Sequence, residues 1–147
     1  MKLNLPSVEL KSRSIDGITE IWDEFRKKYV VLTPEEWVRQ HFLYFMVEQL
    51  GYPKALLKVE FEIKYNGLKK RPDIVAFDSK GDCLVVVECK SAKVKLNQAV
   101  FEQVAVYNNK LKAKYIVITN GLEHFCCEQN DKTGTLHFVQ RIPEYVS

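Results

Sequence analysis

Two carboxylates and an ammonium occur at a spacing that could place them side by side. Asp73 begins one apolar run, and Glu88 and Lys90 end the next, with a short polar segment between the runs. β-Branched runs around such a segment indicate a β-hairpin. A turn centred between Lys80 and Gly81 places Asp73 opposite Glu88, with Cβ atoms about 4.5–5.5 Å apart. Because side chains alternate along a strand, Lys90 points to the same face as Glu88.

Apolar residues occupy both faces of this predicted hairpin, so we expect it to be covered on both sides. One face carries Val75, Phe77, Leu84 and Val86, and the other carries Ile74, Ala76, Val85 and Val87. Opposed carboxylates repel each other, and burial raises the cost of ionising either one. A divalent cation between them removes both difficulties, and oxygen ligands suit Mg²⁺ or Mn²⁺. The alternative is that Lys90 neutralises the pair at a solvated strand end, and the spacing leaves both explanations open.

Several short segments occur in an order that resembles a known family. Pro72-Asp73, fourteen residues and then Glu88-Cys89-Lys90 resemble the PD-(D/E)xK nuclease signature. The wider set resembles the N-terminal nuclease domain of type I restriction enzyme R (motor) subunits, over about residues 18–140. The segments of that set are 33–40, Gly51-Tyr52-Pro53, 66–73, 103–107 and Thr119-Asn120-Gly121.

The resemblance implies a Mg²⁺-dependent DNA endonuclease, with Mn²⁺ as a substitute. In that family Asp73 and Glu88 would hold the metal together with the backbone carbonyl of Cys89. Lys90 would position the attacking water or offset the growing negative charge. Gln103 and Tyr107 would complete the catalytic set.

Gln103 and Tyr107 lie four residues apart, on one face of a predicted helix. The resemblance implies that they sit beside the active site and aid DNA placement and cleavage. From the residues alone, a core tyrosine with a nearby satisfied amide is the simpler explanation.

The first predicted helix raises a similar choice. The resemblance suggests that one of its glutamates completes the acidic cluster, and Glu36 is preferred to Glu35. Glu36 could instead close a capping box with Thr33, and the two roles are equally open. Arg39, one turn later, could bind phosphate or pair with Glu36.

Charge and composition describe a soluble globular chain with a basic rim near the carboxylates. The net charge is only +3, from 22 basic and 19 acidic residues, yet Lys69, Lys70 and Arg71 precede Asp73 and Lys93 follows Lys90. Such a rim suits a DNA backbone, although a solvated lysine-rich face is common. The four cysteines lack zinc-site spacing, and no apolar run reaches the roughly 20 residues of a membrane span. We expect a cytoplasmic protein with no membrane contact.

The pattern of elements predicts an α/β (α+β) fold with a restriction-endonuclease-like core. We expect one domain: a loose arm or edge strand over 1–17, a core over 33–119 and an appended hairpin over 122–140. Within the core, a helix over about 34–50 precedes three strands, a helix over about 96–111 and a buried strand over 113–119. The three strands are 59–65, 71–78 and 83–90, with a turn at Asn66-Gly67 after the first.

Two functions from different classes follow. The first is a metal-dependent endonuclease in a restriction-modification system. The second is a non-cleaving DNA-binding or assembly module of a restriction or repair complex. A nuclease fold with a task unrelated to nucleic acid is a third, weaker option. The phosphate-binding loop of ATP-driven motors is missing, so a separate motor or specificity subunit is an expected partner. A homodimer is a further expected partner arrangement, because two active sites could each cut one DNA strand.

Overall fold

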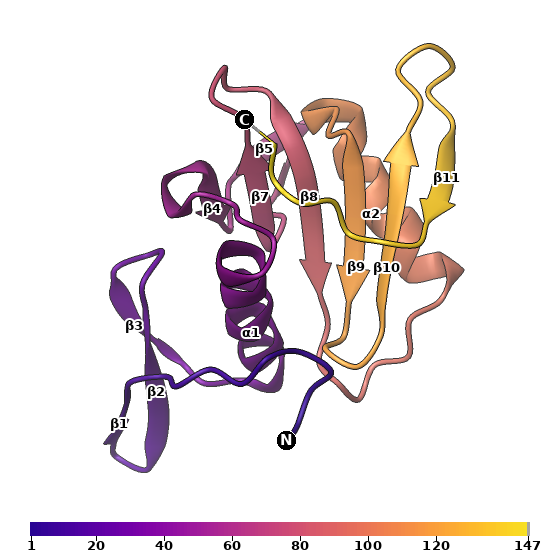
Figure 1. Ribbon diagram of the computed structural model, residues 1–147. Coiled ribbons are helices and arrows are strands. Elements are labelled where there is room, and N and C mark those ends of the chain that lie inside the picture. The colour runs from indigo at the N-terminus through magenta and orange to yellow at the C-terminus, as the bar shows by residue number, and fades with distance from the viewer. Residues whose placement is uncertain (147) are drawn as a thin grey trace.

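A mixed six-stranded sheet forms the centre of the molecule (Figure 1). The computed structural model describes residues 1–146, except for the side chain of Tyr107. The strand order is β11-β10-β9-β8-β7-β4, in which β8 and β9 are parallel and the other neighbours are antiparallel. These strands are β4 (Leu57–Val59), β7 (Ile74–Phe77), β8 (Cys83–Cys89), β9 (Tyr115–Thr119), β10 (His124–Gln129) and β11 (Leu136–Val139).

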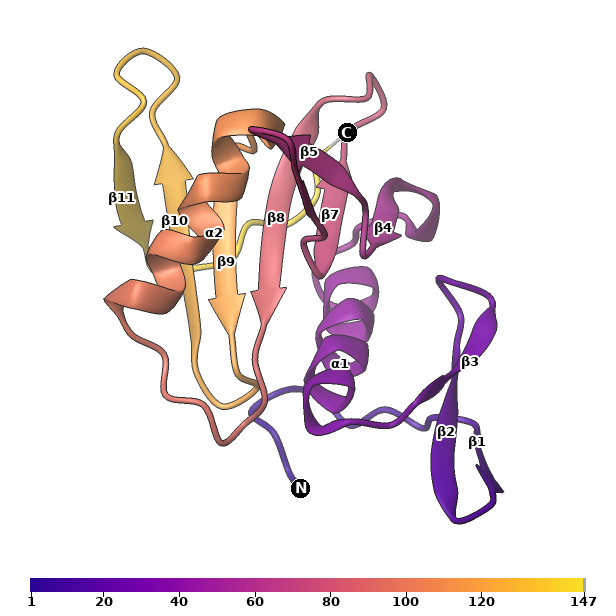
Figure 2. The same ribbon diagram turned by 180° about the vertical axis from the view of Figure 1, so that it is seen from behind.

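Two helices cover opposite faces of this sheet (Figures 1 and 2). α1 (Pro34–Glu48) packs on the face that carries Ile74, Ala76, Val85 and Val87. α2 (Gln98–Leu111) packs on the face that carries Val75, Val86 and Ile116. The prediction of a hairpin buried on both sides is therefore confirmed. Among the described residues, no helix has the length and apolar character needed to cross a membrane.

The helix ends follow local capping chemistry. The Thr33 hydroxyl accepts a hydrogen bond from the backbone N–H of Glu36 at 3.0 Å, and Pro34 occupies the first helical turn of α1. Both features satisfy or remove N–H groups that lack a partner at a helix start. Asn97 caps α2 in the same way, through the N–H of Val100 at 3.1 Å.

The β7–β8 hairpin has the predicted register near its open end but not near its turn. Ile74 pairs with Val87, and continuing this register by one residue puts Asp73 opposite Glu88. At the other end Phe77 pairs with Cys83, because the register shifts by one residue at a bulge. Leu84 consequently packs with the α1-side cluster, whereas the alternation predicted it on the opposite face. The turn is therefore odd in length, and the bulge compensates for it.

The strand predicted over 59–65 is divided in two. β4 ends at Val59, Glu60 adopts a left-handed backbone (φ 54°), and β5 (Ile63–Tyr65) belongs to a different sheet. The turn predicted at Asn66-Gly67 is present, but it joins β5 to the short strand β6 (Leu68–Lys70). β4 itself pairs with β7. The central sheet thus keeps three strands between the helices, with the β5–β6 hairpin inserted after the first.

The ends of the chain add further strands. β1 (Ser12–Ile15), β2 (Ile18–Asp23) and β3 (Lys28–Val31) form a separate antiparallel sheet, in which β1 is an edge strand as expected. A short 3₁₀ helix, η1 (Lys54–Leu56), precedes β4. The predicted closing hairpin is present as β10 and β11, and β10 pairs with β9. The segment before β1 is docked, because Leu3 is buried and the N–H of Asn4 donates to the carbonyl of Gly121 at 2.8 Å.

The turn after β9 should not tolerate a side chain at Gly121. This residue has φ +85°, and an added Cβ would lie 2.8 Å from Leu3 Cδ2 and 3.2 Å from Val38 Cγ2. We expect Gly121→Ala to lower the free energy of unfolding by about 2–3 kcal/mol, through backbone strain and overpacking together. Gly134→Ala is the matched control, since Gly134 has φ +71° with open space around it and should cost only about 1 kcal/mol. If urea unfolding shows that Gly121→Ala and Gly134→Ala lower the free energy of unfolding equally, this account of the turn is wrong.

Candidate functional site

Asp73 and Glu88 meet where β7 begins and β8 ends. Asp73 is buried, and its Oδ2 accepts a hydrogen bond from the backbone N–H of Cys89 at 2.8 Å. That bond ties the start of one strand to the end of the next. The Asp73 carboxyl group is also close enough to Glu88 to raise the pKa of that residue. The structure therefore brings together the two acids that the sequence predicted to be opposite each other.

Ionising both carboxyl groups of this pair at once is energetically unfavourable, because their negative charges are close together and partly shielded from water. Burial is the largest cause that raises the pKa of Glu88 to about 10, and the hydrogen bond and negative charge of Asp73 contribute to the same rise. The positive charge of Lys90 acts in the opposite direction. Lys90 is half-buried, and its backbone N–H donates to the carbonyl of Thr119 on β9 at 2.8 Å. The Lys90 ammonium is therefore near enough to act on Glu88, and the catalytic role of the three groups stays a prediction.

A buried arginine holds the other side of Asp73. Arg39 Nη2 lies 2.6 Å from Asp73 Oδ1, and Arg39 Nη1 lies 2.7 Å from Glu36 Oε1. Although burial disfavours the charged guanidinium, the Asp73 and Glu36 carboxylates raise the pKa of Arg39. Of the two roles predicted for Arg39, pairing with Glu36 is confirmed. A direct contact with DNA phosphate would require this enclosed side chain to leave both carboxylates, and that second role of Arg39 stays a prediction.

The ion pairs continue from Arg39 to the N-terminal sheet. Glu36 Oε1 also accepts from Arg26 Nη2 at 2.7 Å, and Arg26 Nε lies 2.5 Å from Asp23 Oδ2 in β2. Arg26 Nη1 reaches Glu60, just after β4, at 2.6 Å. Alternating charges therefore link β2, α1 and the start of β7, which fixes Asp73 relative to the N-terminal sheet.

The structure places Glu35 near the acid pair and surrounds Glu36 with hydrogen-bond donors. The Glu36 carboxylate accepts hydrogen bonds from Arg26, Arg39 and Gln40. It contributes to the cap only through its backbone N–H. Glu35 is the α1 acid beside the pair: burial and the charge of Asp73 raise its pKa, while Arg39 and Lys90 lower it. The family resemblance favoured Glu36, and no pattern in the sequence indicated which of the two neighbouring glutamates faces the pair.

The predicted basic rim lies largely in solvent. Lys69 and Arg71 are exposed and Lys70 is half-buried, on β6 and the link to β7. Arg71 forms an exposed ion pair with Glu62 at 3.3 Å. Lys93 is exposed in the loop between β8 and α2. These four residues retain the accessibility that a contact with DNA phosphate requires.

The assignment of Gln103 and Tyr107 stays a prediction. Gln103 is exposed on α2, beside the buried positions Phe101, Val104 and Asn108. Its side chain therefore lies outside the stripe that packs on the sheet. The side chain of Tyr107 is outside the described residues.

The donor set at this site suits a hard cation that keeps part of its water shell. Among residues 1–146, no group of three or more His, Cys, Asp or Glu is close enough to enclose a metal ion. The site therefore offers two carboxylates, those of Asp73 and Glu88. Two are enough for Mg²⁺, which proteins commonly hold by one or two carboxylates with several waters. Burial, and after it the hydrogen bond and negative charge of Asp73, raise the pKa of Glu88, and a divalent cation would offset both the burial and the repulsion. The four cysteines are free thiols, three of them buried, and are not part of this set.

Comparisons with known proteins agree with this fold. A family model described as "Type I restriction enzyme R protein N terminus" matches residues 34–143. A solved structure described as a fragment of an HsdR subunit of a type I restriction enzyme from Vibrio vulnificus YJ016 is similar, with a TM-score of 0.54 and 21% sequence identity. The alignment covers 76% of the present chain and 24% of that chain, so the present chain spans about a quarter of its length. No curated protein matches. The predicted restriction-endonuclease-like fold is confirmed.

Proposed function

Since the chain belongs to the family of type I restriction enzyme R protein N termini, we propose that it is a metal-dependent nuclease domain that hydrolyses DNA phosphodiester bonds. The observation that carries the proposal is the pair formed by buried Asp73 and half-buried Glu88, with the charge of Lys90 beside it. Inward-facing carboxylates are costly in a sheet core, and a structural role does not require two of them opposite each other.

Asp73 and Glu88 are the residues that would hold Mg²⁺ or Mn²⁺, with the Cys89 carbonyl as a third oxygen and Glu35 as the nearby acid of α1. A bound divalent cation would supply the positive charge that polarises a phosphate oxygen and acidifies a water molecule. Asp73 remains oriented throughout, because Arg39 and the Cys89 N–H each hold one of its oxygens. A carboxylate oxygen accepts more than one contact, so these bonds leave lone pairs free.

Lys90 would act on the substrate directly. Its ammonium belongs to the same group of charges as Glu88 and Glu35. From there it can stabilise the negative charge that develops on the phosphate, or hold a water molecule beside it. Lys69, Lys70, Arg71 and Lys93 would draw in the DNA backbone without reading its sequence. Gln103 and Tyr107 keep their proposed role in placing the strand.

The partners follow from the family and are part of the proposal. DNA is the substrate, and a motor or specificity subunit would deliver it, whether in the same longer protein or in another chain. A second copy of this domain would be needed wherever one active site must cut both strands.

A non-cleaving DNA-binding or assembly module is the second candidate function. One observation favours it: Asp73 is bound by an arginine in a buried ion pair. In a module without cleavage, the Arg39–Asp73 ion pair would be a permanent structural element and no divalent cation would bind to Asp73.

A plasmid-nicking assay separates the two candidates. We expect supercoiled DNA to be nicked in Mg²⁺ or Mn²⁺ and to remain intact in EDTA. A second readout is thermal unfolding, in which Mn²⁺ should raise the melting temperature, because a ligand that binds only the folded state stabilises it. DNA binding that weakens with salt, without nicking or stabilisation by Mn²⁺, would favour the non-cleaving module.

A further inference from the structure

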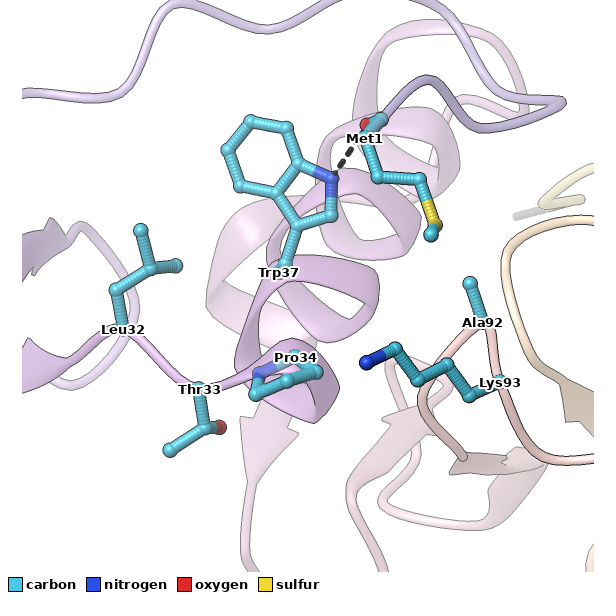
Figure 3. Close-up of a pocket in the computed structure, with 7 residues that line it drawn as sticks. All are labelled: Met1, Leu32, Thr33, Pro34, Trp37, Ala92 and Lys93. Atoms are coloured by element: carbon cyan, nitrogen blue, oxygen red, sulfur yellow. Dashed lines mark hydrogen bonds between the residues drawn. The ribbon is translucent and has the colours of Figure 1, made fainter.

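An apolar pocket of about 490 Å³ opens beside the first turn of α1 (Figure 3). Its lining residues include Met1, Leu32, Pro34, Trp37, Ala92 and Lys93. In Figure 3 the Lys93 side chain extends from the loop after β8 toward Pro34, so one ammonium stands at an otherwise apolar wall. Trp37 and Ala92 also pack against the core on the α1 side of the sheet, and none of the lining residues belongs to the carboxylate pair.

The pocket adjoins the carboxylate site through both of its walls. Pro34 immediately precedes Glu35, whose pKa responds to the charges of Asp73 and Lys90. On the other wall, Lys93 follows Lys90 by three residues. Consecutive Cα atoms are 3.8 Å apart, so the backbone of Lys93 lies within about 11 Å of that of Lys90. One strand of a duplex rises about 3.4 Å per nucleotide, and the pocket is therefore within a few nucleotides of a phosphate at Lys90.

Trp37 is held in a fixed orientation at this wall. Its indole N–H donates to the carbonyl of Met1 at 3.0 Å (Figure 3). On another side, the His41 ring packs against the indole with a centroid distance of 4.3 Å. An aromatic ring that is already ordered loses little further freedom when a ligand stacks on it.

We propose that this pocket receives an unpaired nucleobase of the strand bound at the carboxylate site, with the Lys93 ammonium on an adjacent phosphate. The inference rests on the proposed function, because the strand must pass Lys90. It adds a binding site for one nucleotide and predicts a preference for single-stranded or locally opened DNA next to the cut.

A nucleotide matches this wall better than an apolar peptide does. A base offers a flat face to an aromatic ring, and its phosphate offers an anion to the neighbouring cation. An apolar side chain would fill the same volume but leave Lys93 without a counter-charge. Small-ligand pockets commonly measure about 300–1,000 Å³, which includes the value found here.

Fluorescence of Trp37 provides the test. The chain has two tryptophans, so Trp22→Phe leaves Trp37 as the single reporter. Adding Glu88→Gln and EDTA prevents cleavage during the titration. The probes are a short single-stranded oligonucleotide and the same backbone with abasic sites, which carry equal numbers of phosphates. We expect the first probe to quench Trp37 and to bind at least about fivefold more tightly than the abasic probe.

Variants separate the base contact from the phosphate contact, and because changes at Trp37 remove the fluorescent reporter, their binding is measured by the anisotropy of dye-labelled probes. Trp37→Ala should weaken binding of the normal oligonucleotide by roughly 5- to 100-fold and leave the abasic probe unchanged, whereas Trp37→Phe should keep most of the affinity. If Trp37→Ala does not fold, Ala92→Leu, which fills the pocket, should have the same selective effect. Lys93→Ala should weaken both probes alike and reduce the salt dependence by about one phosphate contact.

The outcomes distinguish this inference from the nuclease proposal. Equal affinity of the two probes, or no quenching, would overturn the base pocket even if the wild-type protein nicks plasmids. Selective quenching by the normal oligonucleotide would support the base pocket even if the protein does not nick plasmids. In that case the nuclease proposal fails and the base pocket stands.

Discussion

Replacing Lys90 with alanine is expected to lower the rate of metal-dependent plasmid nicking at least about 100-fold while leaving the fold standing. Two cations lie next to the Asp73–Glu88 pair among the residues that the structure describes, Arg39 and Lys90. Arg39 is bound in a structural ion pair with Asp73, whereas the Lys90 ammonium is not bound in one by any described residue. Removing a group that stabilises developing charge typically costs about 10²–10³ in rate. Stability should change little, because Lys90 is only half-buried and its backbone bond to Thr119 does not depend on the side chain.

Two further variants make this result specific. Glu88→Gln keeps the volume of the side chain and its ability to donate a hydrogen bond to Asp73, so it should also remove nicking without unfolding the protein. Lys132→Ala removes an exposed lysine from the β10–β11 turn and should leave nicking unchanged. Unchanged nicking by Lys90→Ala, measured as the initial rate of loss of supercoiled plasmid, would refute the role assigned to Lys90.

Replacing Arg39 with leucine is expected to lower the free energy of unfolding by about 3–5 kcal/mol. The change leaves Asp73 without its ion pair in a site where it is only 3% exposed. Breaking one side of a buried pair costs that much because an uncompensated charge remains. Glu36 is affected less, since Arg26 still binds it at 2.7 Å. For a domain of this size the melting temperature should fall by roughly 10 °C.

Arg71→Leu is the matched control for the stability measurement. It removes an arginine from an ion pair with Glu62 in which both side chains are exposed, and it should cost less than about 1 kcal/mol. Adding Asp73→Asn to Arg39→Leu should recover part of the loss, because the orphaned charge disappears with it. If Arg39→Leu and Arg71→Leu lower the melting temperature by similar amounts, the burial of the Arg39–Asp73 ion pair does not add to the cost of breaking it.

Local patterns were sufficient to predict the elements around the site. Thr33 and Pro34 start α1 where the capping chemistry indicated, and the β-branched runs form β7 and β8. The register near Asp73 was predicted correctly although the turn was not, because the extra residue at the bulge restores the pairing. Glu60 was the hardest position to predict: an alternating pattern runs through it, yet its left-handed backbone ends β4.

Contacts between distant segments could not be predicted in the same way. Arg39 and Asp73 are 34 residues apart, and Arg26 reaches Glu36 from a different sheet. Neither spacing reflects the period of a helix or a strand, so no pattern in the sequence indicates these pairs. The placement of Glu35 beside the acid pair depends on how α1 is rotated against the sheet, and neighbouring glutamates leave that rotation undecided.

The sequence by itself determined the two carboxylates, the amine and their common end of one hairpin, because strand alternation and a hairpin register are properties of local backbone geometry. It also contained the ordered segments by which the family is identified. Only the tertiary structure decided which arginine binds Asp73, which glutamate stands beside it and that a tryptophan-lined pocket adjoins the site. Those features arise from the packing of α1 and the N-terminal residues against the sheet, which depends on long-range burial and charge pairing.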